Sequence, residues 1–314
     1  MWHGIPMWGG GGIPVTGGNI YWVNPTTGID TNIGTSKVKP VETLAEAVDR
    51  VTTDNHDIIL MSAAATHSVT EMITLSKSRV HIIGLDGATR RFGQRAKLSM
   101  GVTTAATDLA VLKNTGVGNT FTNLKFMSSN TKEQSLYSVI EAGEYAEYNG
   151  CEIYKSSLLD GDAVAELVLN GDSAQFNGCT IGSLANFITA TGVRANILLT
   201  GAIGGEGKVM RDCVFSDCLI WRNSGHTANR FVWAPAAADV ERLLLFERTG
   251  FINAVNAVAD PAECVDAGAA LTAGNIILDP LCYCANATKL ATQTGILVTG
   301  PAPAAGQGIA VNAA

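Results

Sequence analysis

The sequence predicts an all-β protein, a right-handed parallel β-helix with an N-terminal capping helix and an extended glycine-rich N-terminal arm. Two observations predict this fold class. First, charged residues make up only 16% of the chain, while 34 of its 314 residues are glycine, against roughly 25% charged residues in ordinary globular proteins. Such a composition favours short strands joined by tight corners over charged helical surface. Second, one strand motif recurs at the scale of a solenoid coil.

The recurring motif joins an apolar residue, an Asn or Asp and a short alternating strand. Its copies are residues 121–126, 148–153, 176–181 and 210–215. The spacing is 28 residues from Cys151 to Cys179 and 34 from Cys179 to Cys213, so it is regular to within one loop insertion. In a solenoid, equivalent residues of successive coils line up along the axis. We therefore expect two interior ladders, one of small apolar thiols and one of larger apolar side chains: Cys151, Cys179 and Cys213, and Ile153, Ile181 and Phe215.

Residues 1–18 are predicted to form an anchoring arm. Four consecutive glycines, Gly9 to Gly12, make this segment flexible in isolation. Such a tail becomes ordered when a neighbouring copy or a different protein holds it. The alternative is a tail that folds back on its own domain. The residues expected to anchor the arm to a partner are apolar: Trp2, Ile5, Met7, Trp8 and Ile13.

Residues 19–61 are predicted to contain a first strand, a loop, one helix and a second strand. The β-branched and aromatic residues of 19–23 predict the first strand. Pro40 is expected to open a helix over 40–53, because Val41, Leu44, Ala45, Val48 and Val51 recur at helical spacing. The apolar run 58–61 predicts a buried strand directly after it.

Residues 62–255 are assigned to the parallel β-helix and residues 256–314 to an alanine-rich C-terminal β region. The predicted strands of the β-helix include 71–75, 80–84, 109–113, 121–127, 243–246 and 251–252. Strands at 275–278 and 295–298 are predicted beyond them. The tail from Pro301 is uncharged and rich in small residues, which suits packing against another subunit in a homo-oligomer.

The charge balance excludes several classes of function. A net charge of -7 and a pI near 5.2 argue against nucleic-acid binding, which requires clustered basic residues. No stretch approaches the roughly 20 apolar residues of a membrane span. The first residues have no basic region or continuous apolar run typical of a signal peptide. We therefore expect synthesis in a cytoplasm, with the seven cysteines as reduced thiols.

No motif in the sequence predicts catalysis, a cofactor or a metal site. Asp160-Gly161-Asp162 has the composition of a turn, and the acidic residues between Glu141 and Glu152 are expected to be solvated. Cys213, Cys218 and His226 have no zinc-site spacing. In the glycine-rich segment 201–208, Val209 follows where a phosphate-binding loop needs Ser or Thr. The chain is therefore predicted not to be an enzyme.

Several segments together resemble the pectate-lyase-like β-helix proteins found among tailed-phage virion components. The resemblance lies in Tyr21-Trp22-Val23-Asn24, the Gly28-x-Asp30-x-Asn32-x-Gly34 loop, Thr43-Leu44-x-x-Ala47-Val48, and Ile82-Ile83-Gly84-Leu85 with Arg90-Arg91 after it. It extends as a pattern over about residues 19–255. In that family an N-terminal helix caps the open end of the solenoid, which implies the same role for the helix at 40–53.

The resemblance implies a structural virion protein of a tailed bacteriophage, such as a capsid decoration protein or a spike-like component. The arm would then bind the major capsid protein or another virion protein, and the family implies a trimer. The alternative is a β-helix that binds or depolymerises a polysaccharide, such as a host surface glycan. In that case Trp221 and Trp233 are the aromatic residues expected to stack on sugars.

Overall fold

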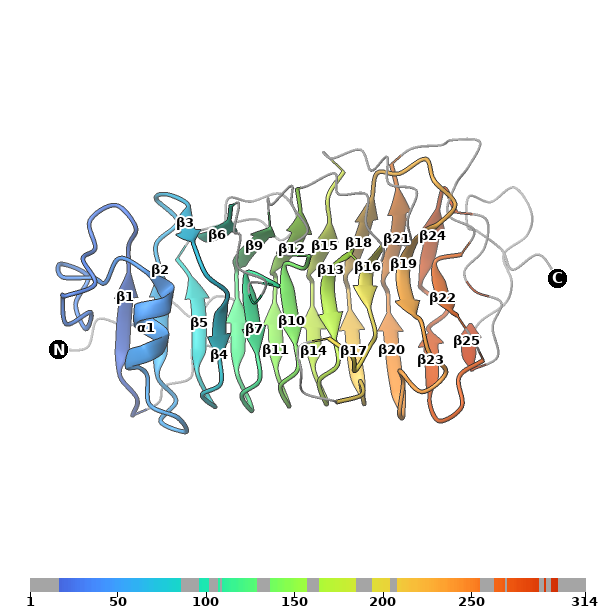
Figure 1. The fold of residues 1–314 in the computed structure, drawn as a ribbon, viewed down its shortest axis with the longest axis horizontal. Helices are drawn as coiled ribbons and strands as arrows, with labels where there is room; N and C mark the ends of the chain where they lie inside the picture. Colours follow the sequence, from blue (N-terminus) through green and yellow to red (C-terminus); the bar gives the residue numbers. More distant parts are fainter. Residues whose placement is uncertain are drawn as a thin grey trace.

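The chain folds as a parallel β-helix whose described strands form three parallel sheets (Figure 1). The computed structural model describes residues 17–85, 96–101, 107, 109–128, 136–156, 164–184, 194–203, 208–254, 263–268, 270–287, 291 and 295–298. From β2 to β24 the described strands belong to sheet 1, sheet 2 and sheet 3 in that order, once per coil. Each strand therefore pairs with strands of the preceding and following coils.

Sheet 1 extends along the whole described length of the molecule. Its strands are β1 (Ile20–Val23), β2 (Ile58–Met61), β5 (His81–Gly84), β8 (Thr120–Thr122), β11 (Glu147–Asn149), β14 (Gln175–Asn177), β17 (Cys213–Ser216), β20 (Leu243–Glu247), β23 (Asn275–Leu278) and β25 (Ile296–Val298).

Sheet 2 follows sheet 1 in each coil. Its strands are β3 (His67–Val69), β6 (Ala96–Met100), β9 (Leu124–Ser128), β12 (Glu152–Lys155), β15 (Thr180–Gly182), β18 (Leu219–Arg222), β21 (Gly250–Asn253) and β24 (Tyr283–Ala285).

Sheet 3 completes each coil. Its strands are β4 (Ile73–Leu75), β7 (Leu112–Asn114), β10 (Val139–Glu141), β13 (Val164–Leu169), β16 (Arg194–Leu198), β19 (Asn229–Ala234) and β22 (Val265–Ala267).

Residues with a positive φ angle make the two corners that border sheet 1. Between sheets 1 and 2 the corner residues of successive coils are Asn123, Gly150, Gly178, Asp217 and Arg248, with φ between 46° and 59°. The amide of each of the first four donates to a carbonyl of the next coil, as Gly150 does to Asn177 at 2.8 Å. Gly, Asn and Asp tolerate this left-handed conformation best. The segment 121–127, predicted as one strand, is therefore two strands that meet at Asn123.

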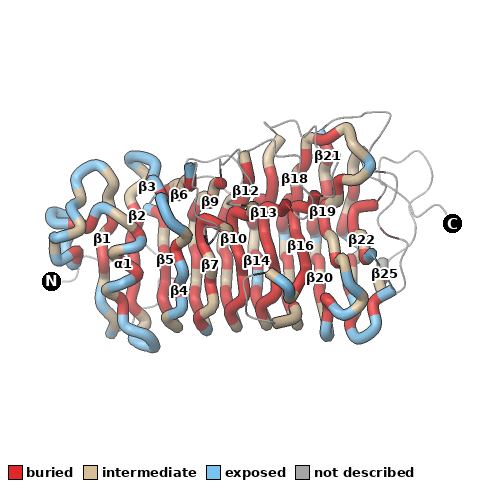
Figure 2. Tube along the Cα trace, viewed as in Figure 1, coloured by how far each residue is buried: buried red, intermediate tan, exposed pale blue. Residues whose placement is uncertain are grey.

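The interior is filled by rows of apolar side chains that run along the axis. In sheet 2 one row consists of Leu98, Phe126, Ile153, Ile181, Ile220 and Phe251, all fully buried and in register. Figure 2 shows the buried residues concentrated along the strands and the exposed ones in turns and loops. Stacking on the next coil is what removes each row from water, because a single coil has no enclosed core.

A second, smaller cluster lies outside the solenoid, on the outer face of sheet 3. Ile140, Val168 and Leu198 alternate with the interior row and pair with one another in register. The half-buried Trp233 pairs with Leu198 and packs against the same cluster. The middle of this outer face is thus apolar.

The helix α1 (Leu44–Arg50) is shorter than predicted. Thr43 caps it, because its hydroxyl accepts a hydrogen bond from the Glu46 amide at 3.2 Å. The helix therefore begins after Thr43 and not at Pro40. Its buried residues are Leu44, Ala47 and Val48, and it contacts β1 and β4 near one end of the solenoid (Figure 1). The capping role stays a prediction.

The free edge of β1 is covered by the segment between β1 and α1. The Trp22 amide donates to the Gly34 carbonyl at 2.7 Å, and the Val41 amide donates to the Trp22 carbonyl at 2.9 Å. The Asn24 amide in turn donates to Val41 at 2.9 Å. The Asp30 carboxylate holds this segment against the helix by accepting from the amides of Glu42 and Thr43.

Candidate functional site

A stack of aromatic rings forms the inner row of sheet 1. Ring centroids of consecutive members are 4.5, 4.7, 4.4 and 5.0 Å apart, and the rings are nearly parallel. The members are Phe121, Tyr148, Phe176, Phe215 and Phe246. All five rings are fully buried, and each of the three inner rings lies between two others, so this stack fixes the register between coils.

A ladder of small hydrogen-bond donors lies beside the aromatic stack, at the start of sheet 2. The Cys151 thiol donates to the Phe121 carbonyl at 3.3 Å, and Cys179 donates to Tyr148 at 3.3 Å. Each later donor likewise reaches the carbonyl of the aromatic residue in the preceding coil. These later donors are Cys218, Thr249 and Cys282.

The register corrects two of the predicted ladder positions. Cys151 and Cys179 lie in equivalent positions, but the next member is Cys218 and not Cys213, since Thr180 pairs with Leu219. Cys213 lies at the start of β17, where it pairs with Leu244. Phe215 likewise belongs to the aromatic stack, and Ile220 continues the row of Ile153 and Ile181. All of these residues are buried in the interior.

The expectation of reduced thiols is wrong for one pair. Cys264, directly before β22, and Cys284, in β24, are joined by a disulfide that links sheet 3 to sheet 2. The free cysteines of the described chain are Cys151, Cys179, Cys213, Cys218 and Cys282, and all are buried. Burial raises the pKa of Cys213 and of Cys282 to about 12, so these thiols are poor nucleophiles.

Glu141 was expected to be solvated, but it is fully buried at the end of β10. Its carboxylate accepts from the Tyr148 hydroxyl at 2.6 Å, the Asn114 side-chain amide at 2.9 Å and the Gly143 amide at 2.8 Å. Burial raises the pKa of Glu141 to about 7, although these hydrogen bonds lower it. The carboxylate thus serves to join the aromatic stack to sheet 3.

A group of buried charges lies in the interior where sheets 2 and 3 meet. Glu166 is 3.3 Å from Arg194 and 3.7 Å from Arg222, measured between carboxylate oxygens and guanidinium nitrogens. Arg222 also donates to Asn196 at 2.9 Å and to Asn229 at 2.8 Å. Burial lowers the pKa of Arg222 to about 9. These contacts tie the two sheets together.

Lys155 lies at the end of β12 and is also buried, 2% exposed. Its ammonium donates to the Ser128 hydroxyl at 3.2 Å. Burial, together with the charge of Arg194, lowers the pKa of Lys155 to about 7. A lysine with such a pKa is a general-base candidate by chemistry, but its burial keeps a polymeric substrate away from it.

Two histidines stack near the start of sheet 1. The His56 and His81 ring centroids are 5.4 Å apart, and their facing nitrogens are 3.2 Å apart. The other His81 nitrogen contacts the Thr120 hydroxyl at 2.9 Å. Burial lowers the pKa of His81 to about 4, with a further contribution from the charge of His56. Both rings are therefore structural in this arrangement.

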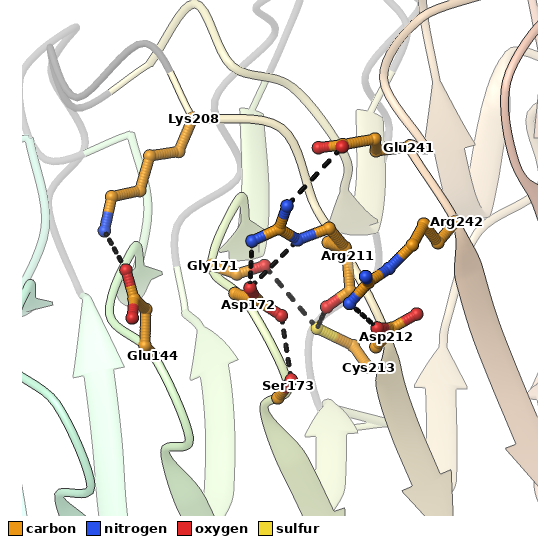
Figure 3. Close-up of polar contacts among 10 residues, drawn as sticks. All are labelled: Glu144, Gly171, Asp172, Ser173, Lys208, Arg211, Asp212, Cys213, Glu241 and Arg242. Atoms are coloured by element: carbon orange, nitrogen blue, oxygen red, sulfur yellow. Dashed lines mark hydrogen bonds and ion pairs between the residues drawn. The ribbon is translucent and has the colours of Figure 1, made fainter.

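The charged corner is a surface row of ion pairs where sheet 3 turns into sheet 1 (Figure 3). Parallel bridges place Glu144, Asp172 and Arg211 at equivalent positions of successive coils. Asp172 accepts from Arg211 at 2.9 Å, and Arg211 lies 3.5 Å from Glu241. The remaining pairs of the row are Lys208 with Glu144 and Arg242 with Asp212.

Asp172 stays ionised at this corner. Partial burial acts to raise its pKa, but hydrogen bonds from Arg211 and Ser173 hold the pKa below the usual value of an aspartate. The corner therefore offers fixed charges of both signs to a ligand at the surface. In the sequence these residues appear only as isolated charges near the repeat motif, so the row could not be predicted from it.

Several predicted residues lie outside the described part of the chain. These are the arm residues Trp2, Ile5, Met7, Trp8 and Ile13, together with Asp160, Asp162, Arg90 and Arg91. Trp221 and Trp233, the two tryptophans considered for sugar stacking, are both half-buried on outer strand faces. Among the residues that the structure describes, no cluster of His, Cys, Asp or Glu is arranged to hold a metal ion. Nor does the described chain contain a helix with the length and apolarity needed to cross a membrane.

Comparison with known proteins shows the fold. No model of a known protein family matches the sequence, and no curated protein matches it. Among solved structures, the pectate lyase Pel9A matches with a TM-score of 0.61 at 13% identity, over 91% of this chain and 69% of that one. A rhamnogalacturonan lyase matches with a TM-score of 0.63 at 12% identity, over 90% and 73%.

A pectin methylesterase, PemA from Erwinia chrysanthemi, matches with a TM-score of 0.50 at 11% identity, over 89% and 92%. The chain has the pectate-lyase-like right-handed parallel β-helix fold. Sequence identities this low support a conclusion about the fold only, because one scaffold supports many activities.

Proposed function

We propose that this chain is a structural protein of a tailed-phage virion. In this role it is a rigid rod that offers a binding surface and has no catalytic activity. One observation supports this most. Glu141 and Lys155, the two described groups whose pKa is shifted to about 7, both lie buried inside the solenoid. Catalytic acids and bases must instead reach a substrate.

The proposed place of the protein is the capsid surface, as a decoration protein attached through residues 1–18, with a spike-like tail component as the second location. A trimer is the proposed assembly, and the major capsid protein is the proposed partner of the arm.

Incorporation into particles tests this proposal directly. A chain that lacks residues 1–18 and the full chain are each supplied to particles that lack the protein, and the bound amount is measured after purification. We expect the full chain to bind, and we expect the bound amount of the shortened chain to be at least tenfold lower. Equal incorporation of the two chains would show that residues 1–18 are not needed for attachment. If neither chain is incorporated, the virion role is contradicted.

The second candidate is a β-helix that binds or modifies a polysaccharide. The observation that favours it is the likeness to two polysaccharide lyases at TM-scores of 0.61 and 0.63. Depolymerisation assays on host surface glycans separate the two candidates. Cleavage that disappears when a surface carboxylate pair is replaced would establish this candidate over the first.

A further inference from the structure

We propose that Tyr145, together with the charged corner beside it, forms a binding site for a neutral hexopyranose glycan. Tyr145 is 62% exposed, which is unusual for an aromatic side chain at a turn of a well-packed coil. In the described part of the chain its hydroxyl has no hydrogen-bond partner and its ring contacts no other ring. Its backbone, in contrast, is fixed, since its amide donates to the Asp172 carbonyl at 2.8 Å.

The backbone conformation of Tyr145 is the regular one of the corner between sheets 3 and 1. Its φ angle is 54°, in the left-handed region that a bulky residue adopts only at a cost. The equivalent positions in the two adjoining coils are Gly118, with φ 67°, and Ser173, with φ 56°. Arg79 lies at the same position one coil before Gly118, with φ 55°, so this corner imposes the left-handed conformation and accommodates a long side chain in it.

The small neighbours also leave the tyrosine ring open. Successive coils are about 4.8 Å apart, so side chains on adjoining coils would normally cover one another. Here one neighbour has no side chain and the other has only a hydroxymethyl group. The faces of the Tyr145 ring are therefore available to a flat apolar partner, and the C–H face of a sugar ring is such a partner.

The polar groups around the ring match the rest of a sugar. Glu144 precedes Tyr145, and Asp172 and Arg211 occupy the same row in the following coils (Figure 3). The side chains of Glu144 and Arg211 are 42% and 37% exposed, so their remaining donors and acceptors face water. Hydroxyl groups both donate and accept, and a row with both kinds of partner suits them.

The charge of the row selects the class of glycan. Lys208, Arg211 and Arg242 supply three positive charges, and Glu144, Asp172, Asp212 and Glu241 supply four negative charges, an excess of one negative charge. This balance offers no net attraction to an acidic polysaccharide or a nucleic acid. A protein partner would require a much larger apolar area than one ring. A linear neutral glycan along the axis fits best, since the row repeats with the coils.

Calorimetric titration of the full chain with neutral and acidic hexasaccharides tests the site. The neutral probes are hexamers of β-1,4-glucose, α-1,4-glucose and β-1,4-galactose, and the acidic probe is the hexamer of galacturonic acid. We expect at least one neutral probe to bind and the acidic probe to bind at least tenfold more weakly. Replacement Tyr145→Ala should weaken binding at least tenfold, whereas Tyr145→Phe should keep affinity within about twofold.

Leu281→Ala provides the matched control, because Leu281 is 63% exposed but lies far along the chain; its affinity should be unchanged. Circular dichroism establishes that each variant is folded. If no neutral hexamer binds, or if Tyr145→Ala binds as well as the parent chain, the proposal is wrong. The site does not depend on the virion role, since binding is measured on the isolated protein and incorporation on particles.

Discussion

The Tyr148 hydroxyl donates a hydrogen bond of 2.6 Å to the buried carboxylate of Glu141. This contact joins the aromatic stack of sheet 1 to the end of a sheet 3 strand. It is also the one place in the described stack where a ring has a polar group, since the other members are phenylalanines. The side chain of Tyr148 therefore has two separable roles, packing and hydrogen bonding.

Tyr148→Phe separates these roles. The ring stays stacked between Phe121 and Phe176, but the carboxylate loses one of its donors. Since hydrogen bonds to charged groups contribute about 1.5–3 kcal/mol, we expect the free energy of unfolding to fall by about 2 kcal/mol in urea denaturation. Tyr145→Phe is the matched control, because that hydroxyl is at the surface; it should change stability by less than about 0.5 kcal/mol. Equal effects of both variants would contradict the buried hydrogen bond.

Glu141 predicts a pH dependence of stability. Its pKa is about 7 in the folded state against the usual 4.5, so between these values the folded chain binds more protons than the unfolded chain. Stability attributable to Glu141 therefore falls as pH rises from about 4.5 to 7. His81 acts in the opposite direction below its usual pKa, because its folded pKa is about 4.

Comparison of the parent chain with Glu141→Gln isolates this effect, since His81 is common to both. We expect the stability of the parent relative to the variant to decrease by about 3 kcal/mol between pH 4.5 and pH 7.5. The measurement is urea denaturation at several pH values. A difference that does not change with pH would show that Glu141 keeps the same pKa in both states.

Substitution of two glycines that have positive φ angles should lower the free energy of unfolding by different amounts. Gly178 has φ 59° and no heavy atom near an added Cβ, so Gly178→Ala should cost only the backbone strain, about 1 kcal/mol. Gly178→Asn should cost less, because Asn123 occupies the equivalent position two coils earlier. Gly182 has φ 98°, and an added Cβ would overlap the Trp221 carbonyl oxygen. Gly182→Ala should therefore cost about 3 kcal/mol or more, measured by thermal and urea unfolding.

The buried thiols predict a pattern of chemical labelling. Cys151, Cys179 and Cys218 are buried and donate to backbone carbonyls, so iodoacetamide at neutral pH should leave them unmodified in the folded protein. They should react fully after unfolding in guanidinium chloride. Cys264 and Cys284 should react only when a reductant is also added. Mass spectrometry of the digested protein gives each result, and rapid labelling of Cys179 in the folded chain would contradict the interior ladder.

The repeat motif is sufficient to predict the solenoid, but not its register through the coil that follows Cys179. Cys151 and Cys179 are 28 residues apart, whereas Cys179 and its true successor Cys218 are 39 apart. Most of the extra residues lie between sheet 3 and sheet 1. Because Cys213 also falls near the expected spacing, aligning it with Cys179 looks equally regular in the sequence. Sequence spacing cannot distinguish the two, because only backbone pairing shows which of two nearby cysteines starts a strand of sheet 2.

The strands of sheet 3 were the least predictable. β13 reads Val-Ala-Glu-Leu-Val-Leu and is buried on both faces, so it has no alternation of polar and apolar residues. Glu166 within it, and Glu141 at the end of β10, look like surface charges in the sequence. Their partners Arg194 and Tyr148 come from other strands, and nothing local marks either carboxylate as an interior group.

The cover over the β1 edge has a consequence for how copies of this protein associate. A solenoid with bare terminal strands polymerises end to end, because each end is a template for another chain. In this molecule the carbonyl of Gly34 and the amide of Val41 already occupy the positions that an incoming strand would need. Growth of fibres from that end is therefore blocked, which leaves the flanks of the rod for the formation of closed, finite assemblies.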